Sequence, residues 1–164
     1  MPKRVGKSMK THIVVDLDGT LANIDHRLRF IRGDKDKKDW NGFYGAVGQD
    51  TINEWCVELI RAFRLAGYSI VIVSARRQSC LEETKKWLLN NHIFLHQNFM
   101  GTFELFLLRK NNDYTPDVDL KRDWLHKFGK DKILFVVDDR ARVVNMWREE
   151  GLVCLQCADW EEKN

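Results

Sequence analysis

Residues 12–21 read His12-Ile-Val-Val-Asp16-Leu-Asp18-Gly-Thr-Leu21. The apolar, β-branched run before Asp16 predicts a strand that is buried on both faces, as in the middle of a parallel sheet. Because the strand leaves into a turn, Asp16 and Asp18 can converge on one site, and Gly19 lets the backbone turn sharply. Two carboxylates this close together need a cation or a proton between them.

Two later segments have the same strand character. Residues 69–74 and 133–139 are apolar runs that end in Ser74 and in the pair Asp138-Asp139. Amphipathic spacing predicts helices over residues 52–66, 80–90, 120–128 and 143–150, and a last strand over residues 152–157. Residues 23–50 and 91–103 are less regular.

Strands and helices therefore alternate along the chain. This order predicts an α/β fold, a three-layer α/β/α sandwich with a mostly parallel, Rossmann-like central sheet. Parallel strands bring their carboxyl ends to one edge, so Asp16, Ser74, Asp138 and Asp139 should lie there together. Carboxylate oxygens are the ligands that Mg²⁺ prefers, which predicts a magnesium site assembled from two strand ends.

Length and composition limit the remaining possibilities. The 164 residues, 44% of them hydrophobic, are sufficient for one domain with a sizeable core. No apolar run approaches the roughly 20 residues that cross a bilayer, and the first residues do not match a secretory signal. Four cysteines without a dense spacing pattern indicate free thiols and a cytoplasmic protein. The net charge of +3 is compatible with a polyanionic partner without requiring one.

The stretch Asp16-Leu-Asp-Gly-Thr20 resembles the signature of haloacid dehalogenase (HAD) superfamily phosphatases. The resemblance continues, in the family's order, through Ser74, Lys121 and the pair Asp138-Asp139. It implies that Asp16 is the nucleophile, which forms a phosphoaspartate, and that Asp18 is the general acid and base. It also implies metal and substrate contacts: Mg²⁺ held by Asp16, the Asp18 carbonyl and the pair Asp138-Asp139, and phosphate contacts from Thr20, Ser74 and the Ala75 amide, beside Lys121.

Three segments narrow the resemblance further. Residues 74–76, 107–121 and 136–148 are similar to the 3′-phosphatase domain of phage polynucleotide kinase/phosphatase and its free-standing relatives. There, arginines match Arg109, twelve residues before Lys121, and Arg27, eleven residues after Asp16. The resemblance implies that four arginines bind phosphate or fix the acidic groups, and that Asp117 orients Lys121 or one of them. These arginines are Arg27, Arg76, Arg109 and Arg140.

An insert over residues 22–50 follows the first strand. It has room only for a small cap or flap, which would leave the site open to a macromolecular substrate. Its aromatic residues Trp40, Phe43 and Tyr44 would either stack on bases or form the small core of the insert.

The first eleven residues predict a basic tail. Gly6-Lys7-Ser8 ends like a Walker A loop, but Met1 stands where that loop requires its first glycine, so no ATP-binding P-loop is expected. The lone Cys154–Cys157 and His92–His96 pairs do not predict a shared zinc site.

The sequence therefore predicts a single HAD-like phosphatase domain over residues 1–164 that removes 3′-phosphates from DNA or RNA ends with Mg²⁺. Two alternatives remain open at this stage. One is a phosphatase of free nucleotides or of another small phosphate ester. The other is a nucleic-acid-binding module with a vestigial site. Oligomeric state does not follow from the sequence.

Overall fold

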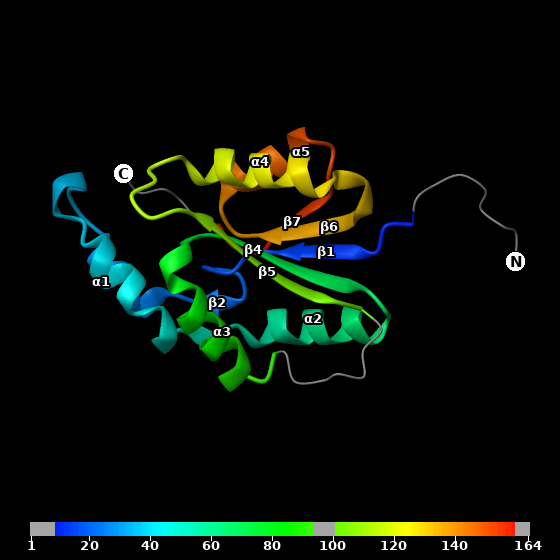
Figure 1. The fold of residues 1–164 in the computed structure, drawn as a ribbon, viewed down its shortest axis with the longest axis horizontal. Coiled ribbons are helices and arrows are strands. Elements are labelled where there is room, and N and C mark those ends of the chain that lie inside the picture. The colour runs from blue at the N-terminus through cyan, green and yellow to red at the C-terminus, as the bar shows by residue number, and fades with distance from the viewer. Residues whose placement is uncertain (1–8, 94–100, 160–164) are drawn as a thin grey trace, which may run out of the picture.

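The centre of the computed structural model is a parallel sheet of five strands in the order β5-β4-β1-β6-β7. The structure describes residues 9–93 and 101–159. The strands are β1 (His12–Val15), β4 (Ser69–Arg77), β5 (Phe103–Arg109), β6 (Ile133–Asp138) and β7 (Cys154–Gln156). The α/β fold class is confirmed (Figure 1).

The three strands predicted to be central occupy the middle of the sheet. β1 pairs in parallel with β4 on one side and with β6 on the other. Side chains of β1 alternate between two cores, with Ile13 and Val15 in one and Val14 in the other, and all three are at most 1% exposed. Burial on both faces explains why these strands are almost entirely apolar.

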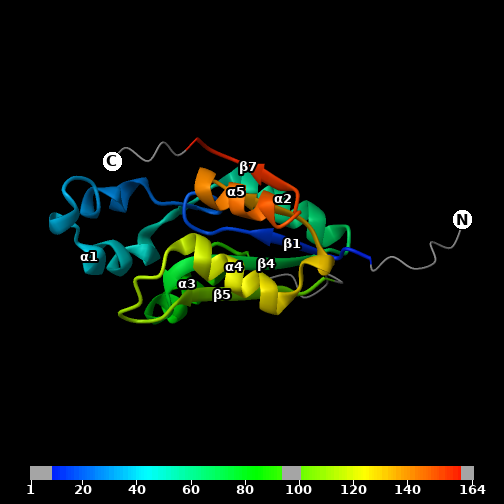
Figure 2. The same ribbon diagram turned by 90° about the horizontal axis from the view of Figure 1, so that it is seen from above.

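Helices cover both faces of the sheet and give the predicted three layers (Figures 1 and 2). α2 (Glu54–Leu65) and α3 (Leu81–Asn90) pack on one face through residues such as Ile60 and Leu88. α4 (Asp117–Phe128) and α5 (Ala141–Glu149) pack on the other through residues such as Leu125 and Trp147. The apolar stripe of each helix therefore faces the sheet.

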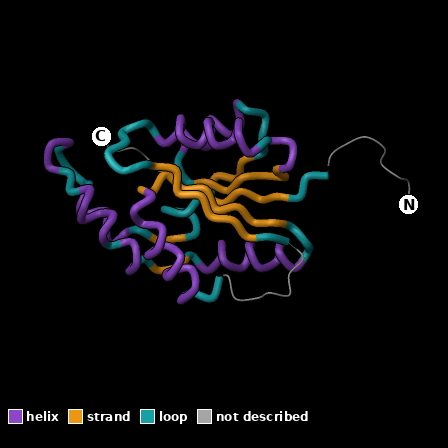
Figure 3. Tube along the Cα trace, viewed as in Figure 1, coloured by secondary structure: helices purple, strands orange, loops and turns teal. Residues whose placement is uncertain are grey.

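The segment after β1 forms a separate excursion beside the carboxyl ends of the strands. It begins at β2 (Ala22–Asn23) and returns at β3 (Thr51–Ile52), and these two strands pair antiparallel. Between them lie α1 (Trp40–Gly45) and the 3₁₀ turns η1 (Asp25–Phe30), η2 (Lys35–Lys37) and η3 (Val47–Gln49). Figure 3 shows these short elements beyond one end of the sheet. We refer to residues 22–52 as the insert.

The sequence interpretation missed strand β5 and the short elements of the insert, and it placed the starts of two helices too late. Strand β5 was not predicted, because Glu104 and the partial burial of its apolar residues give this edge strand no clear pattern. α4 begins at Asp117 rather than at residue 120, and α5 at Ala141 rather than at residue 143. Polar first turns explain the late predicted starts, since hydrophobic spacing marks only the packed part of a helix.

Some predicted features lie outside the described residues. These are Gly6-Lys7-Ser8, most of the basic tail and His96. The end of the predicted tail is fixed, because the Thr11 amide donates to the Lys132 carbonyl at 2.9 Å. All four cysteines are free thiols, as predicted. Within the described ranges, every helix is too short or too polar to cross a bilayer.

Gly101 provides a test of how β5 joins the sheet. A Cβ atom at this position would lie 2.0 Å from the Tyr68 carbonyl oxygen and 2.9 Å from the Ser69 nitrogen. Backbone atoms cannot rotate away as a side chain does, so we expect Gly101→Ala to lower the free energy of unfolding by about 1–3 kcal/mol in a urea titration. Gly45→Ala is the control, because a Cβ there meets nothing within 4 Å. Equal stability of the two variants would contradict this packing.

Candidate active site

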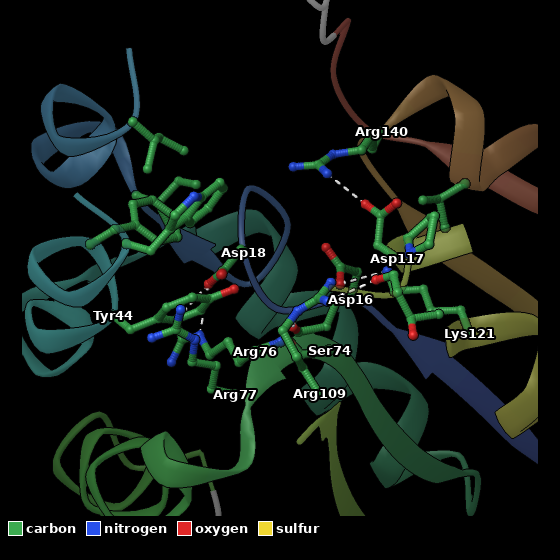
Figure 4. Close-up of a pocket in the computed structure, with 18 of the residues that line it drawn as sticks. Asp16, Asp18, Tyr44, Ser74, Arg76, Arg77, Arg109, Asp117, Lys121 and Arg140 are labelled. Atoms are coloured by element: carbon green, nitrogen blue, oxygen red, sulfur yellow. Dashed lines mark hydrogen bonds and ion pairs between the residues drawn. The ribbon is translucent and has the colours of Figure 1, made fainter. Parts of the chain in front are cut away.

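The carboxyl ends of β1, β4 and β6 open into a cavity of about 290 Å³. In Figure 4, Asp16 lies between two groups of side chains: Asp18, Tyr44, Arg76 and Arg77 on one side, and Asp117, Lys121 and Arg140 on the other. Ser74, Ala75, Arg109, Asp138 and Asp139 also line the cavity. Most residues singled out from the sequence are therefore brought to one place.

Lys121 joins the ends of two strands. Its Nζ donates to Asp16 Oδ1 at 2.8 Å and to Asp138 Oδ2 at 2.7 Å, and the residue is only 3% exposed. Burial opposes the ammonium charge, but the two carboxylates outweigh it and raise the pKa of Lys121 well above its usual value. The lysine is therefore a fixed positive charge beside Asp16.

The carboxylates of Asp138, the last residue of β6, and of Asp139 directly after it both accept hydrogen bonds. The Trp147 indole and the Arg140 amide both donate to Asp138, at 3.1 Å and 3.3 Å. The Thr20 hydroxyl lies 3.4 Å from Asp139 Oδ1 and 3.5 Å from Asp16 Oδ2. Thr20 is fully buried and does not line the cavity, so it braces the acidic groups instead of facing a ligand.

Three buried carboxylates, Asp16, Asp138 and Asp139, can offer oxygen ligands within 4.8 Å of one another. Lys121 pairs with Asp16 and Asp138. Arg140, which also pairs with Asp117, attracts Asp139 and Asp16. Negative charge still predominates among the three carboxylates. Burial and mutual repulsion raise the pKa of Asp139 to about 6 and that of Asp16 well above its usual value. A divalent cation supplies the charge that this set lacks, so the residues fit Mg²⁺.

Asp18 belongs to a second charged network. Its Oδ1 accepts from Arg27 at 2.7 Å and from Arg76 at 2.8 Å. Both arginines also donate to Asp50, whose side chain is fully buried. Burial raises the pKa of Asp18, but Arg76 and Arg27 outweigh it and lower the pKa below its usual value.

The contacts of Arg27 and Arg76 bear on the two roles that the sequence left open for them, phosphate binding and fixing of the acidic groups. Both are at most 1% exposed, and Arg27 does not line the cavity. Its guanidinium packs 4.4 Å from the centre of the Phe43 ring. In this structure the two arginines fix acidic groups, and Arg76 also reaches the cavity wall.

Ser74 and Ala75 lie where the pairing of β4 with β5 is interrupted. Ser74 Oγ accepts from the Arg76 amide at 3.2 Å, which leaves the hydroxyl hydrogen available to a ligand. Arg109 donates to the backbone carbonyls of Ala75, Asp113 and Thr115 at 3.1, 3.0 and 2.7 Å. Arg109 thus holds the loop that follows β5 against the end of β4.

Asp117 pairs with an arginine and not with Lys121. Its carboxylate accepts from Arg140 at 2.5 Å and lies 3.1 Å from Arg142. The sequence interpretation allowed either partner. The side chain of Arg140 is 37% exposed, so of the four predicted arginines it is well placed to meet an anion at the cavity.

Asp50 supports this site from outside the cavity, and the sequence did not reveal it. It stands in the irregular insert, outside any strand end, and the partner of a buried arginine cannot be identified from spacing. Its carboxylate contacts Arg27 and Arg76, and His26 Nε2 lies at hydrogen-bond distance, 2.8 Å, from Oδ1. Its backbone carbonyl accepts a hydrogen bond from the Trp87 indole at 2.6 Å. The sequence offered only a weak signal: an aspartate at the end of the irregular segment, directly before the residues that form β3.

Comparison with known families agrees with the geometry. The model of the polynucleotide kinase PNKP phosphatase domain matches residues 10–161. The chain belongs to this family. The match includes every residue placed at the cavity, together with the insert that carries Asp50. This PNKP phosphatase family is of the HAD type, so the fold and the phosphatase class inferred from the sequence are confirmed.

Solved structures show where similar chains occur. A chain of the Pnkp1/Rnl/Hen1 complex is 26% identical, with a TM-score of 0.73 over 97% of this chain and 52% of its own length. A chain of the Pnkp1/Rnl/Hen1 RNA repair complex is 25% identical, with the same TM-score over 96% and 47%. This chain therefore spans about half the length of these PNKP relatives.

A more distant structure shows the fold alone. The HAD family enzyme bt-2542 of Bacteroides thetaiotaomicron, solved with magnesium and inorganic phosphate, is 15% identical. Its TM-score is 0.55 over 94% of this chain and 98% of that one. The α/β/α arrangement is therefore shared beyond the PNKP phosphatase family.

Asp50→Asn tests the second network. The variant leaves Arg27 and Arg76 buried with one carboxylate between them, so we expect the free energy of unfolding to fall by about 3 kcal/mol, measured by urea denaturation. Asp36→Asn is the matched control, because Asp36 is an exposed residue of the same insert. A loss below about 0.5 kcal/mol for Asp50→Asn would show that this carboxylate does not support the arginines.

Proposed function

We propose that this chain is a Mg²⁺-dependent phosphomonoesterase that removes 3′-phosphates from DNA or RNA ends through a phosphoaspartate on Asp16. The observation that carries the proposal is the placement of Asp16 in the cavity, beside a fixed ammonium and between two further groups of charged side chains. Membership of the PNKP phosphatase family supports both the reaction and the substrate class.

In the first step, an Asp16 carboxylate oxygen attacks the phosphorus atom and the bond from phosphorus to the 3′-oxygen breaks. Lys121 neutralises charge that would otherwise repel a phosphate dianion from the carboxylate. Ser74 and the backbone of Ala75 are placed to donate hydrogen bonds to the phosphoryl oxygens. Asp18 must first take up a proton, which Arg27 and Arg76 oppose by lowering its pKa, and it then gives this proton to the leaving 3′-oxygen.

In the second step, water attacks the phosphoaspartate, Asp18 takes a proton from that water, and inorganic phosphate leaves with Asp16 restored. The arginines Arg27 and Arg76 hold the Asp18 carboxylate on its own side of the cavity. Their charges favour the ionised form of Asp18, which is the form that this second step requires.

Asp16, Asp138, Asp139 and the Asp18 carbonyl would hold Mg²⁺. When bound, the ion supplies positive charge that offsets the charge of the phosphoryl group and of the buried carboxylates. Asp139 is the least constrained carboxylate of this set, since the side-chain hydrogen bond that it accepts, from the Thr20 hydroxyl, is a long one of 3.4 Å.

Metal binding can be measured without substrate. We expect Mg²⁺ to raise the melting temperature of the wild-type protein, because a ligand at 100 times its Kd stabilises the folded state by about 2.7 kcal/mol. Asp139→Asn should lose this shift, since it removes a ligand and one of the charges that attract the ion. Differential scanning calorimetry with and without EDTA provides the measurement.

Asp131→Asn is the control for metal binding, because Asp131 is exposed in the 3₁₀ turn before β6. It should keep the wild-type shift. If Mg²⁺ raised the melting temperature of Asp139→Asn as much as that of the wild type, Asp139 would not be a ligand of the metal.

Substrate preference tests the proposed reaction. We expect release of inorganic phosphate from a 3′-phosphorylated oligonucleotide to exceed release from its 5′-phosphorylated counterpart and from free nucleotides by at least tenfold in kcat/KM. Asp16→Asn should abolish this release while the far-ultraviolet circular dichroism spectrum is unchanged. Malachite green detection of phosphate provides the rate.

The outcomes separate the alternatives. Preference for free nucleotides or for 5′-phosphates would contradict the proposed 3′-phosphorylated strand end. Preference for free nucleotides would favour a small phosphate ester as the substrate. Inactivity of the wild-type protein with Mg²⁺ on every phosphate ester would favour a binding module. Full activity of Asp16→Asn would exclude this residue as the nucleophile.

A further inference from the structure

The cavity has two halves of different chemistry. Around Asp16 its walls are charged, as described above. Towards the insert the walls are apolar and aromatic, formed by Ile24, Leu28, Ile31, Trp40, Phe43 and Tyr44. Phosphate transfer uses the charged half alone, so the apolar half requires a different explanation.

Part of the aromatic group is structural and part is accessible. Phe43 is 5% exposed and packs edge-on against both Trp40 and Tyr44, which makes it the core of the insert. Trp40 is 38% exposed and stacks on Tyr44 with ring centres 6.2 Å apart and an angle of 27°. Phe43 therefore forms the small core of the insert, whereas Trp40 is a partly exposed ring held in place at the cavity.

The ring of Tyr44 is fixed to the sheet. The Arg77 guanidinium lies 4.8 Å from its centre, and Arg77 also donates to Asn41 Oδ1 at 3.0 Å. Tyr44 and Asn41 belong to α1 of the insert, and Arg77 is the last residue of β4. The aromatic surface is thus preorganised relative to the catalytic edge of the sheet.

A further aromatic ring, that of Tyr114, lines the cavity from the loop after β5. Tyr114 is 82% exposed. Its neighbours on both sides are anchored, since the Asp113 and Thr115 carbonyls accept from Arg109 and the Thr115 amide donates to the Asp113 carboxylate at 2.9 Å. An exposed ring on an anchored loop is available for a ligand at low entropic cost.

We propose that Trp40, Tyr44 and Tyr114 form a base-binding subsite that contacts the base of the terminal nucleotide whose 3′-phosphate lies at Asp16. This subsite rests on the proposed function and specifies its substrate as a nucleotide end read through its base. Aromatic rings stack on any base, so the subsite tolerates sequence differences. The cavity volume, about 290 Å³, is at the lower end of the range for small-ligand pockets and suits one nucleotide better than a base-paired end.

The test compares two substrates that differ only in the terminal base. One is a single-stranded oligonucleotide with a 3′-phosphate, and the other is the same oligonucleotide with an abasic terminal nucleotide. We expect Trp40→Ala and Tyr114→Ala each to lower kcat/KM for the first substrate by about tenfold and to leave the abasic substrate within twofold of wild type.

Trp55→Ala is the matched control. Trp55 is 46% exposed on α2 and does not line the cavity, so its loss should leave both rates unchanged. Tyr114→Ala keeps the test valid if Trp40→Ala unfolds the insert, because the exposed tyrosine ring is not part of a core.

The failures are distinguishable. Equal rate losses on both substrates, or no loss on either, would overturn the base-binding subsite and leave the 3′-phosphatase proposal standing. Hydrolysis of p-nitrophenyl phosphate without hydrolysis of either oligonucleotide by the wild-type protein would overturn the 3′-phosphatase proposal and the subsite together.

Discussion

The buried ammonium of Lys121 is the contact on which the catalytic edge of this sheet depends. It comes from α4 and reaches the ends of β1 and β6, which lie 105 and 17 residues away in the chain. Without it, the carboxylates of Asp16, Asp138 and Asp139 would face one another with no cation among them, at a cost that burial increases. The lysine therefore fixes the position of α4 against the sheet and makes the acidic edge tolerable.

The two charged networks differ in how their charges are matched, and this difference favours one of them as the site of the proposed metal. Asp18 and Asp50 face Arg27 and Arg76, so two negative charges are matched by two positive ones. In the set around Lys121, three carboxylates share one hydrogen-bonded ammonium and the more distant charge of Arg140, so negative charge predominates. A divalent cation would therefore be attracted to the set around Lys121 more than to the set around Arg27 and Arg76, although Asp16 and Asp18 lie only two residues apart in sequence.

Features that leave a local pattern of apolar and charged residues could be predicted from the sequence, and features that depend on tertiary contacts could not. The strands that are buried on both faces consist of apolar runs, and the carboxylates directly after them mark the catalytic edge, so β1, β4 and β6 and their acidic residues were predictable. Strand β5 lies at the edge, where partial burial removes the pattern. Asp50 and the partners of Arg27 were not predictable, because a pairing between an insert and a distant strand depends on tertiary structure and leaves no local periodicity.

The insert links the proposed base-binding subsite to the proposed general acid, Asp18. Its η1 turn carries Arg27, which holds Asp18, and its α1 helix carries Trp40, which faces the cavity. Asp50, at its return to the core, binds Arg27 and also Arg76 of β4. Since these contacts tie one short segment to both Asp18 and the sheet, the insert cannot move away from the cavity without releasing Arg27 from Asp18. The wall that faces the apolar part of a ligand is therefore also the support that keeps the proposed general acid in place.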